Sequence, residues 1–175
     1  MAELSQILQD AIKLEQDGEQ YYQMAAEKAL NPLAKNTFKA LAEQEQEHAR
    51  LVEQYYDAVR EGGSRPSADT IGDQDYSLVT TAREIFQKAR AELADGIPAA
   101  EDLHQLYEET MEMERKSIAL YQAGAEQAED EEQRQFFNYL VEQERGHLQL
   151  LAQGQQYLDD PESWYFEQEQ WTVEG

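Results

Sequence analysis

Apolar residues recur along most of this chain at alternating steps of three and four, the spacing that places side chains on one stripe of an α-helix. Segments with this spacing run over about residues 3–30, 33–60, 98–128 and 131–158. All four prolines lie at or near the ends of these segments, where a helix is expected to stop or begin. The pattern predicts an all-α protein with four long helices.

The connections between the segments differ in length. Short turns join the first segment to the second and the third to the fourth, whereas about residues 61–97 separate the second from the third. Such a long connection does not fit a turn between neighbouring antiparallel helices. Residues 78–93 have helical spacing of their own, so we expect the crossover to carry an extra short helix. The predicted fold is a four-helix bundle over residues 1–158, made of two hairpins and one long crossover.

The two predicted hairpins repeat one design. FKALAEQEQEHARLV at 38–52 aligns with FNYLVEQERGHLQLL at 137–151 without a gap, at an offset of 99 residues. An internal repeat at a fixed offset indicates two copies of one structural unit. The same offset matches Glu15 with Glu114, Tyr22 with Tyr121, Glu45 with Glu144, and His48 with His147.

The stripes that should face the interior carry an unusual set of polar residues. In chain order they are Leu4, Leu8, Ala11, Glu15, Gly18, Tyr22, Ala25, Ala29; Ala34, Phe38, Leu41, Glu45, His48, Val52, Tyr55, Val59; Leu103, Tyr107, Thr110, Glu114, Ser117, Tyr121, Gly124, Ala128; and Gln133, Phe137, Leu140, Glu144, His147, Leu151, Gly154, Leu158. Their only charged residues are four glutamates, and their only histidines are two. All six stand in the middle of their helices.

Four carboxylates buried in one layer need a positive partner. Each unpaired ion would lose several kcal/mol of solvation, and like charges would raise the energy further. No Lys or Arg stands on the stripes, whereas two divalent metal ions would balance four carboxylates. Glu and His three residues apart share one face of a helix, so each such pair can bind one ion. We therefore predict a dinuclear metal site, with Glu15, Glu114 or both Glu-x-x-His glutamates as bridges.

The ligand types narrow the choice of metal. Carboxylate and imidazole ligands suit iron or manganese, and zinc is a possible substitute. Tyr22 and Tyr121 stand two turns from Glu15 and Glu114 on the same stripes and could donate hydrogen bonds to the site. A third Glu-x-x-His pair ends in His104, but it has no counterpart in the first half of the chain. We interpret that pair as accidental.

Composition restricts the partners and the compartment. The net charge is −23, which disfavours nucleic acid and anionic membranes as partners. The chain has no cysteine, which excludes disulfides and cysteine-bound iron within it. No apolar run reaches the roughly 18 residues of a membrane span, and the N-terminus has no basic start followed by an apolar run. We expect a soluble cytoplasmic protein. A metal-free acidic module that binds basic partners is the alternative from another functional class.

At these residues the chain resembles the rubrerythrin-like branch of the ferritin-like di-iron carboxylate superfamily, over roughly residues 2–158. The resemblance implies that iron would be held by Glu15, Glu45, His48, Glu114, Glu144 and His147. It implies a catalytic role for Tyr22 and Tyr121 beside the ligands. The activity it implies is reduction of hydrogen peroxide to water, or more slowly of dioxygen, with electrons from an external donor.

Two departures from the family pattern shape this expectation. The chain has no rubredoxin domain, so a separate electron-donor protein such as a rubredoxin is expected. The family also carries an extra carboxylate one turn after the third-helix ligand, where this chain has Ser117. Ser117 makes a ferroxidase that oxidises Fe(II) the main alternative. A di-iron oxygenase is less favoured, because the stripes show no pocket for an organic substrate.

The C-terminal segment 159–175 differs from the rest of the chain. It is acidic and contains the aromatic residues Trp164, Tyr165, Phe166 and Trp171. We expect this tail to pack on the bundle or on a second copy, and we expect a homodimer.

Overall fold

The computed structural model describes residues 2–66, 85 and 103–159. These residues form four long helices: α1 (Ala2–Lys28), α2 (Pro32–Glu61), α5 (Leu103–Glu126) and α6 (Glu131–Asp159). The predicted all-α four-helix bundle is confirmed for this part of the chain. The start of the third segment, the crossover helix except Ile85, and the aromatic tail lie outside the described residues. None of the described helices has the length and hydropathy needed to cross a membrane.

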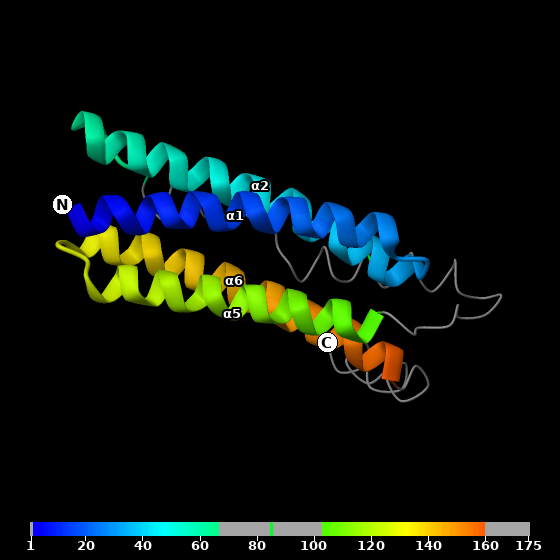
Figure 1. Cartoon of the computed structure of the whole chain (residues 1–175). Coiled ribbons are helices and arrows are strands. Elements are labelled where there is room, and N and C mark those ends of the chain that lie inside the picture. Colours follow the sequence, from blue (N-terminus) through cyan, green and yellow to red (C-terminus); the bar gives the residue numbers. More distant parts are fainter. Residues whose placement is uncertain (1, 67–84, 86–102, 160–175) are drawn as a thin grey trace, which may run out of the picture.

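The helices pair as two hairpins. α1 packs mainly against α2, and α5 packs mainly against α6, while α1 also meets α5 and α2 meets α6. Figure 1 shows that the end of α2 and the start of α5 lie at opposite ends of the bundle. A short turn could not join two ends that lie so far apart. Their separation agrees with the long crossover that the sequence predicts. Each hairpin brings one half of the internal repeat to the interface.

Local sequence signals set the helix boundaries at the turns. The Asn31 side chain accepts hydrogen bonds from the backbone N–H groups of Leu33 and Ala34, and Pro32 stands at the first helical position of α2. Gly62 ends α2 in the left-handed conformation, with φ of 69°. Asp130 caps α6 by accepting the N–H of Gln133 at 2.8 Å. These caps fix the register of the two helices that carry the Glu-x-x-His motifs.

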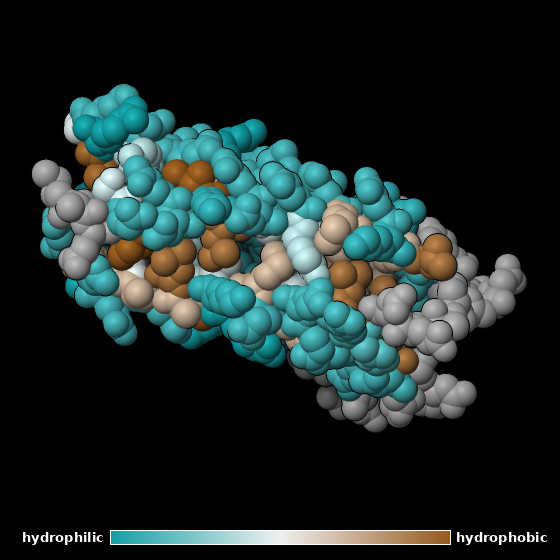
Figure 2. Space-filling view, viewed as in Figure 1, coloured by the Kyte–Doolittle hydropathy of each residue, from teal (hydrophilic) through white to brown (hydrophobic). Residues whose placement is uncertain are grey.

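The apolar core is divided into two clusters. One contains Tyr22, Phe38 and Tyr107, and the other contains Tyr55 and Phe137. Among the described residues, the glutamates and histidines of the repeat form a buried polar layer that belongs to neither cluster. The surface in Figure 2 is mostly hydrophilic, and part of its apolar area shows in the band between α1 and α5. The bundle thus holds its polar layer between two apolar halves.

Arg65 ties the first hairpin to the second. Its guanidinium lies 2.8 Å from Asp130 and 2.9 Å from Glu132, at the turn between α5 and α6. The guanidinium also lies over the Tyr55 ring, 6.0 Å from the centroid. These contacts of Arg65 link the chain segment after α2 to the turn before α6 at one end of the bundle.

Gly124 marks a close approach of α5 to the core. A Cβ atom at this position would lie 2.7 Å from Cδ1 of Phe137, a fully buried ring that packs edge-on against Phe136. We expect Gly124→Ala to lower the free energy of unfolding by about 1–2 kcal/mol, because overpacking outweighs the better helix propensity of Ala. Chemical denaturation measures this change.

Gly18→Ala is the matched control for Gly124→Ala. A Cβ at Gly18 would meet Glu45 only at 3.6 Å, an ordinary contact, so stability should stay the same or rise by up to about 1 kcal/mol. Equal losses of stability in the two variants would contradict the packing around Phe137.

Candidate metal centre

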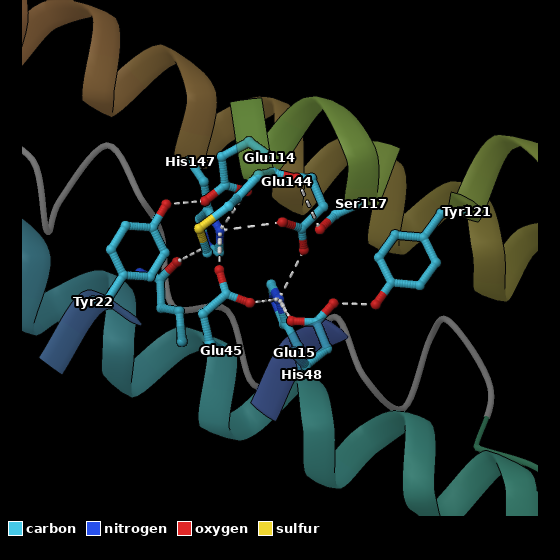
Figure 3. A network of polar contacts seen from close by, with 11 residues as sticks. Glu15, Tyr22, Glu45, His48, Glu114, Ser117, Tyr121, Glu144 and His147 are labelled. Atoms are coloured by element: carbon cyan, nitrogen blue, oxygen red, sulfur yellow. Dashed lines mark hydrogen bonds and ion pairs between the residues drawn. The ribbon is translucent and has the colours of Figure 1, made fainter. Parts of the chain in front are cut away.

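The structure brings the six predicted residues together from all four helices. Figure 3 shows their side chains converging between the two hairpins. None of the six is more than 5% exposed. The residues are Glu15 from α1, Glu45 and His48 from α2, Glu114 from α5, and Glu144 and His147 from α6. The repeat thus supplies two equivalent halves of one buried layer.

The two Glu-x-x-His motifs form the middle of this layer. Ligand atoms of Glu45, His48, Glu144 and His147 all lie within 4.8 Å of one another. Glu144 places Oε1 2.9 Å from His48 Nδ1 and Oε2 3.4 Å from His147 Nδ1. Glu45 places Oε1 3.0 Å from His147 Nδ1 and Oε2 3.9 Å from His48 Nδ1. Each of these two carboxylates therefore faces both imidazoles with one oxygen apiece.

The other two glutamates each face a single imidazole. Glu15 Oε2 lies 3.6 Å from His48 Nδ1, and Glu114 Oε2 lies 3.6 Å from His147 Nδ1. The layer consequently has two half-sites, each with its own carboxylate and imidazole, and two carboxylates between them. Of the bridging alternatives left open by the sequence, this geometry favours the Glu-x-x-His pair.

One detail differs from the expected pairing within each motif. Each motif glutamate lies closer to the histidine of the other hairpin than to the histidine three residues along its own helix. The two imidazole rings stack with centroids 5.1 Å apart at 17°. Because α2 and α6 face each other across the layer, the glutamate side chains extend across the interface.

The two predicted tyrosines bind the outer carboxylates crosswise. Tyr22 on α1 donates a hydrogen bond to Glu114 on α5, and Tyr121 on α5 donates one to Glu15 on α1. Figure 3 shows the two rings at opposite ends of the polar layer. Burial, together with the negative charge of nearby glutamates, raises the pKa of each phenol well above its usual value. Both phenols therefore keep their protons at neutral pH.

Burial and the charges of neighbouring groups shift the pKa values of the ionisable side chains in the layer. Burial raises the pKa of Glu45, and the charges of Glu15 and Glu144 raise it further. Burial and the charge of Glu144 raise the pKa of Glu114 to about 8, despite the opposing effect of His147. The layer without metal thus resists carrying all its negative charges at once.

In the two histidines and in Glu144, the neighbouring groups of opposite charge favour the charged form. Burial alone would lower the pKa of His48, but its contacts with Glu144 and Glu15 outweigh burial and raise it to about 9. The pKa of His147 is raised well above its usual value, because the nearby carboxylates outweigh the effect of burial. Burial works against the charged form of Glu144, but the two histidines hold its pKa well below the usual range.

Several polar atoms of the layer lie at ion-pair distance from one another but make no hydrogen bond. Among the described residues, six of its buried atoms have no hydrogen-bond partner: Glu15 Oε2, His48 Nδ1, Glu114 Oε2, Glu144 Oε1, Glu144 Oε2 and His147 Nδ1. Buried polar atoms without partners are rare in folded proteins, and each one calls for a cause. All six point at the shared interior, and carboxylate oxygens with imidazole nitrogens are ligands that iron accepts. The residues present therefore fit a pair of iron ions.

Two further residues complete the description of the site. The third histidine, His104, is half exposed and lies 3.6 Å from Asp159, away from the buried layer. Gln44, by contrast, is buried, and its side-chain oxygen lies 2.7 Å from Nε2 of His147. The stripe pattern does not reveal this contact, because Gln44 stands beside the inward stripe, one position before Glu45.

Comparison with protein families agrees with this geometry. A family model described as Rubrerythrin matches residues 6–154, which cover all six residues of the layer and both tyrosines. Comparisons with curated proteins and with solved structures gave no match. Since the family match extends over most of the chain, the chain belongs to the Rubrerythrin family of ferritin-like di-iron proteins.

Proposed function

We propose that the buried layer holds two iron ions and that the protein reduces hydrogen peroxide to water with electrons from an external donor protein. The observation that carries this proposal is the pair of buried carboxylates that each face both imidazoles, in a chain of the Rubrerythrin family. A pair of metals held close together is suited to binding both oxygens of a small dioxygen species.

Each half-site would hold one of the two ions. Glu15 with His48 would hold one ion, and Glu114 with His147 would hold the other. Glu45 and Glu144 would bridge them, since each has one oxygen toward each half-site. Four carboxylates would balance two divalent ions, which would remove the like-charge repulsion that adds to burial in raising the pKa of Glu45 and Glu114.

Cleavage of the O–O bond of peroxide to two waters consumes two electrons and two protons. Two ferrous ions, if bound there, would supply the electrons, one from each. Tyr22 and Tyr121 hold their phenol protons on the outer glutamates, so each keeps a proton at its Oη at the edge of the layer, where it could be passed on through the glutamate. Because the chain has no cysteine, it has no rubredoxin-type iron of its own, and we infer an external donor for re-reduction.

Tyr22→Phe and Tyr121→Phe test the part played by the phenols. Each variant removes one hydrogen bond to an outer glutamate and keeps the ring that packs in the core. We expect full iron content with single-turnover oxidation by peroxide slowed about 10²-fold, the lower end of what a positioned proton donor contributes. Stopped-flow rates and iron analysis on the same samples measure both quantities. An unchanged rate in both variants would contradict the proton-donor role.

The reaction itself is tested by anaerobic loading with ferrous iron, followed by stopped-flow mixing with peroxide and, separately, with dioxygen. The near-ultraviolet absorption of the ferric product reports the rate. A peroxidase should react with peroxide orders of magnitude faster than with dioxygen. Comparable rates, with continued turnover of excess iron, would favour a ferroxidase instead. Oxidation no faster than that of free iron in buffer would contradict both activities.

Ser117 favours the ferroxidase as the second candidate. It occupies the stripe position one turn after Glu114, and Gly18 occupies the matching position after Glu15. Both residues are small and uncharged, so the stripes contribute no fifth carboxylate at either half-site. The resulting centre has the same set of ligand types on both sides, which suits ions that enter, react and leave.

A further inference from the structure

The two half-sites are matched in their inner residues but differ in the residue that supports each histidine. Oε1 of Gln44 lies 2.7 Å from Nε2 of His147, and both side chains are buried. The repeat places Gln143 at the position equivalent to Gln44. Within the described part of the chain, no hydrogen bond joins Gln143 to His48. Among the described residues, the imidazole of His147 thus has polar contacts on both sides, whereas that of His48 has them on the side of the carboxylates.

The contact on His147 has a chemical consequence for metal binding. Its Nδ1 faces Glu45, Glu114 and Glu144, so Nδ1 is the nitrogen available to a metal. An amide oxygen can only accept, so the contact with Gln44 Oε1 requires that Nε2 carry the proton. Gln44 and Glu45, consecutive on α2, hold the two nitrogens of the same ring. The ring is thereby fixed in orientation, and the proton on Nε2 would stay in place when Nδ1 gives up its own proton to a metal.

We propose that Gln44 is a positioning residue of the metal centre: by accepting the Nε2–H of His147 it fixes the tautomer that presents Nδ1, and it makes the half-site of His147 the tighter of the two. This inference rests on the proposed metal centre and adds an order of filling. A ring that donates its second N–H to a fixed acceptor is a better ligand, and loss of such an acceptor typically weakens metal binding about 10- to 100-fold.

The test compares Gln44→Leu with Gln143→Leu in the full chain, by anaerobic titration with Co(II) followed by visible absorption and calorimetry. The unmodified protein should bind two ions in a tight and a weaker step. Gln44→Leu should weaken the tight step about 10- to 100-fold, whereas Gln143→Leu should leave both steps unchanged. Equal effects of the two substitutions, or none, would overturn the inference. Absence of any Co(II) binding by the unmodified protein would overturn the proposed metal centre as well.

Two further measurements separate positioning from packing. Gln44→Glu keeps an acceptor oxygen and should retain the tight step, while Leu keeps the approximate volume without an acceptor; a tight step preserved by Leu would overturn the inference. In the Zn(II)-loaded unmodified protein, ¹⁵N NMR should show His147 protonated at Nε2, with slow exchange of that proton. Protonation at Nδ1 would overturn the inference without any substitution.

Discussion

Glu45→Gln combined with Glu144→Gln is expected to abolish metal binding, lowering the content from about two ions per chain to near zero. Both carboxylates face both imidazoles, so their loss affects both half-sites at once. Glutamine preserves size and keeps one oxygen, but it removes the negative charge that balances a divalent ion. Affinity should fall by more than about 100-fold, because even outer partners of metal ligands contribute about 10- to 100-fold. Elemental analysis after anaerobic loading measures the content.

The matched control is Glu43→Gln combined with Glu142→Gln. These residues are exposed, stand two positions before the two glutamates, and are related by the same repeat. The control removes the same charge from the surface and should keep about two ions per chain. Metal content near two in the Glu45 and Glu144 variant would show that the buried layer is not the metal site.

Loading with ferrous or manganous ions under anaerobic conditions should raise the melting temperature by about 15–30 °C. A ligand at 1,000 times its dissociation constant stabilises the folded state by about 4 kcal/mol, and two ions give about 8 kcal/mol. A domain of this size gains about 2–4 °C per kcal/mol. The gain follows from the layer itself, because six buried atoms without hydrogen-bond partners in the described structure would acquire metal bonds.

Differential scanning calorimetry with and without metal measures this shift. The Glu45→Gln and Glu144→Gln variant is the control for this measurement, because its melting temperature should not change when the metal is added. A shift of less than about 3 °C in the unmodified protein, or an equal shift in the variant, would indicate ordinary surface binding of cations.

The sequence contains enough information to predict the fold and the members of the buried layer. Helical spacing and the prolines gave four helices whose observed ends lie within two residues of the expected ones, wherever the structure describes both. The repeat was decisive for the site, because Glu-x-x-His alone is common in so acidic a chain. His104 illustrates the difference: it shares the motif but is half exposed, and it is not part of the buried group formed by the other two motifs.

Contacts across the two hairpins could not be predicted in the same way. A stripe identifies which residues face inward, but the distance and direction between helices depend on packing. The crosswise bonds of Tyr22 to Glu114 and of Tyr121 to Glu15, and the reach of each motif glutamate to the opposite histidine, arise at this interface. Gln44 belongs to the same class, since nothing in the sequence distinguishes it from the other glutamines of α2.

The most direct test of the dinuclear centre is anomalous X-ray diffraction at the iron edge from crystals of the ferrous-loaded protein. We predict two peaks between the hairpins, about 3.5–4 Å apart, as in other two-metal sites. One should lie beside His48 and Glu15 and the other beside His147 and Glu114, with Glu45 and Glu144 between them. A single peak, or peaks only at the protein surface, would contradict the account.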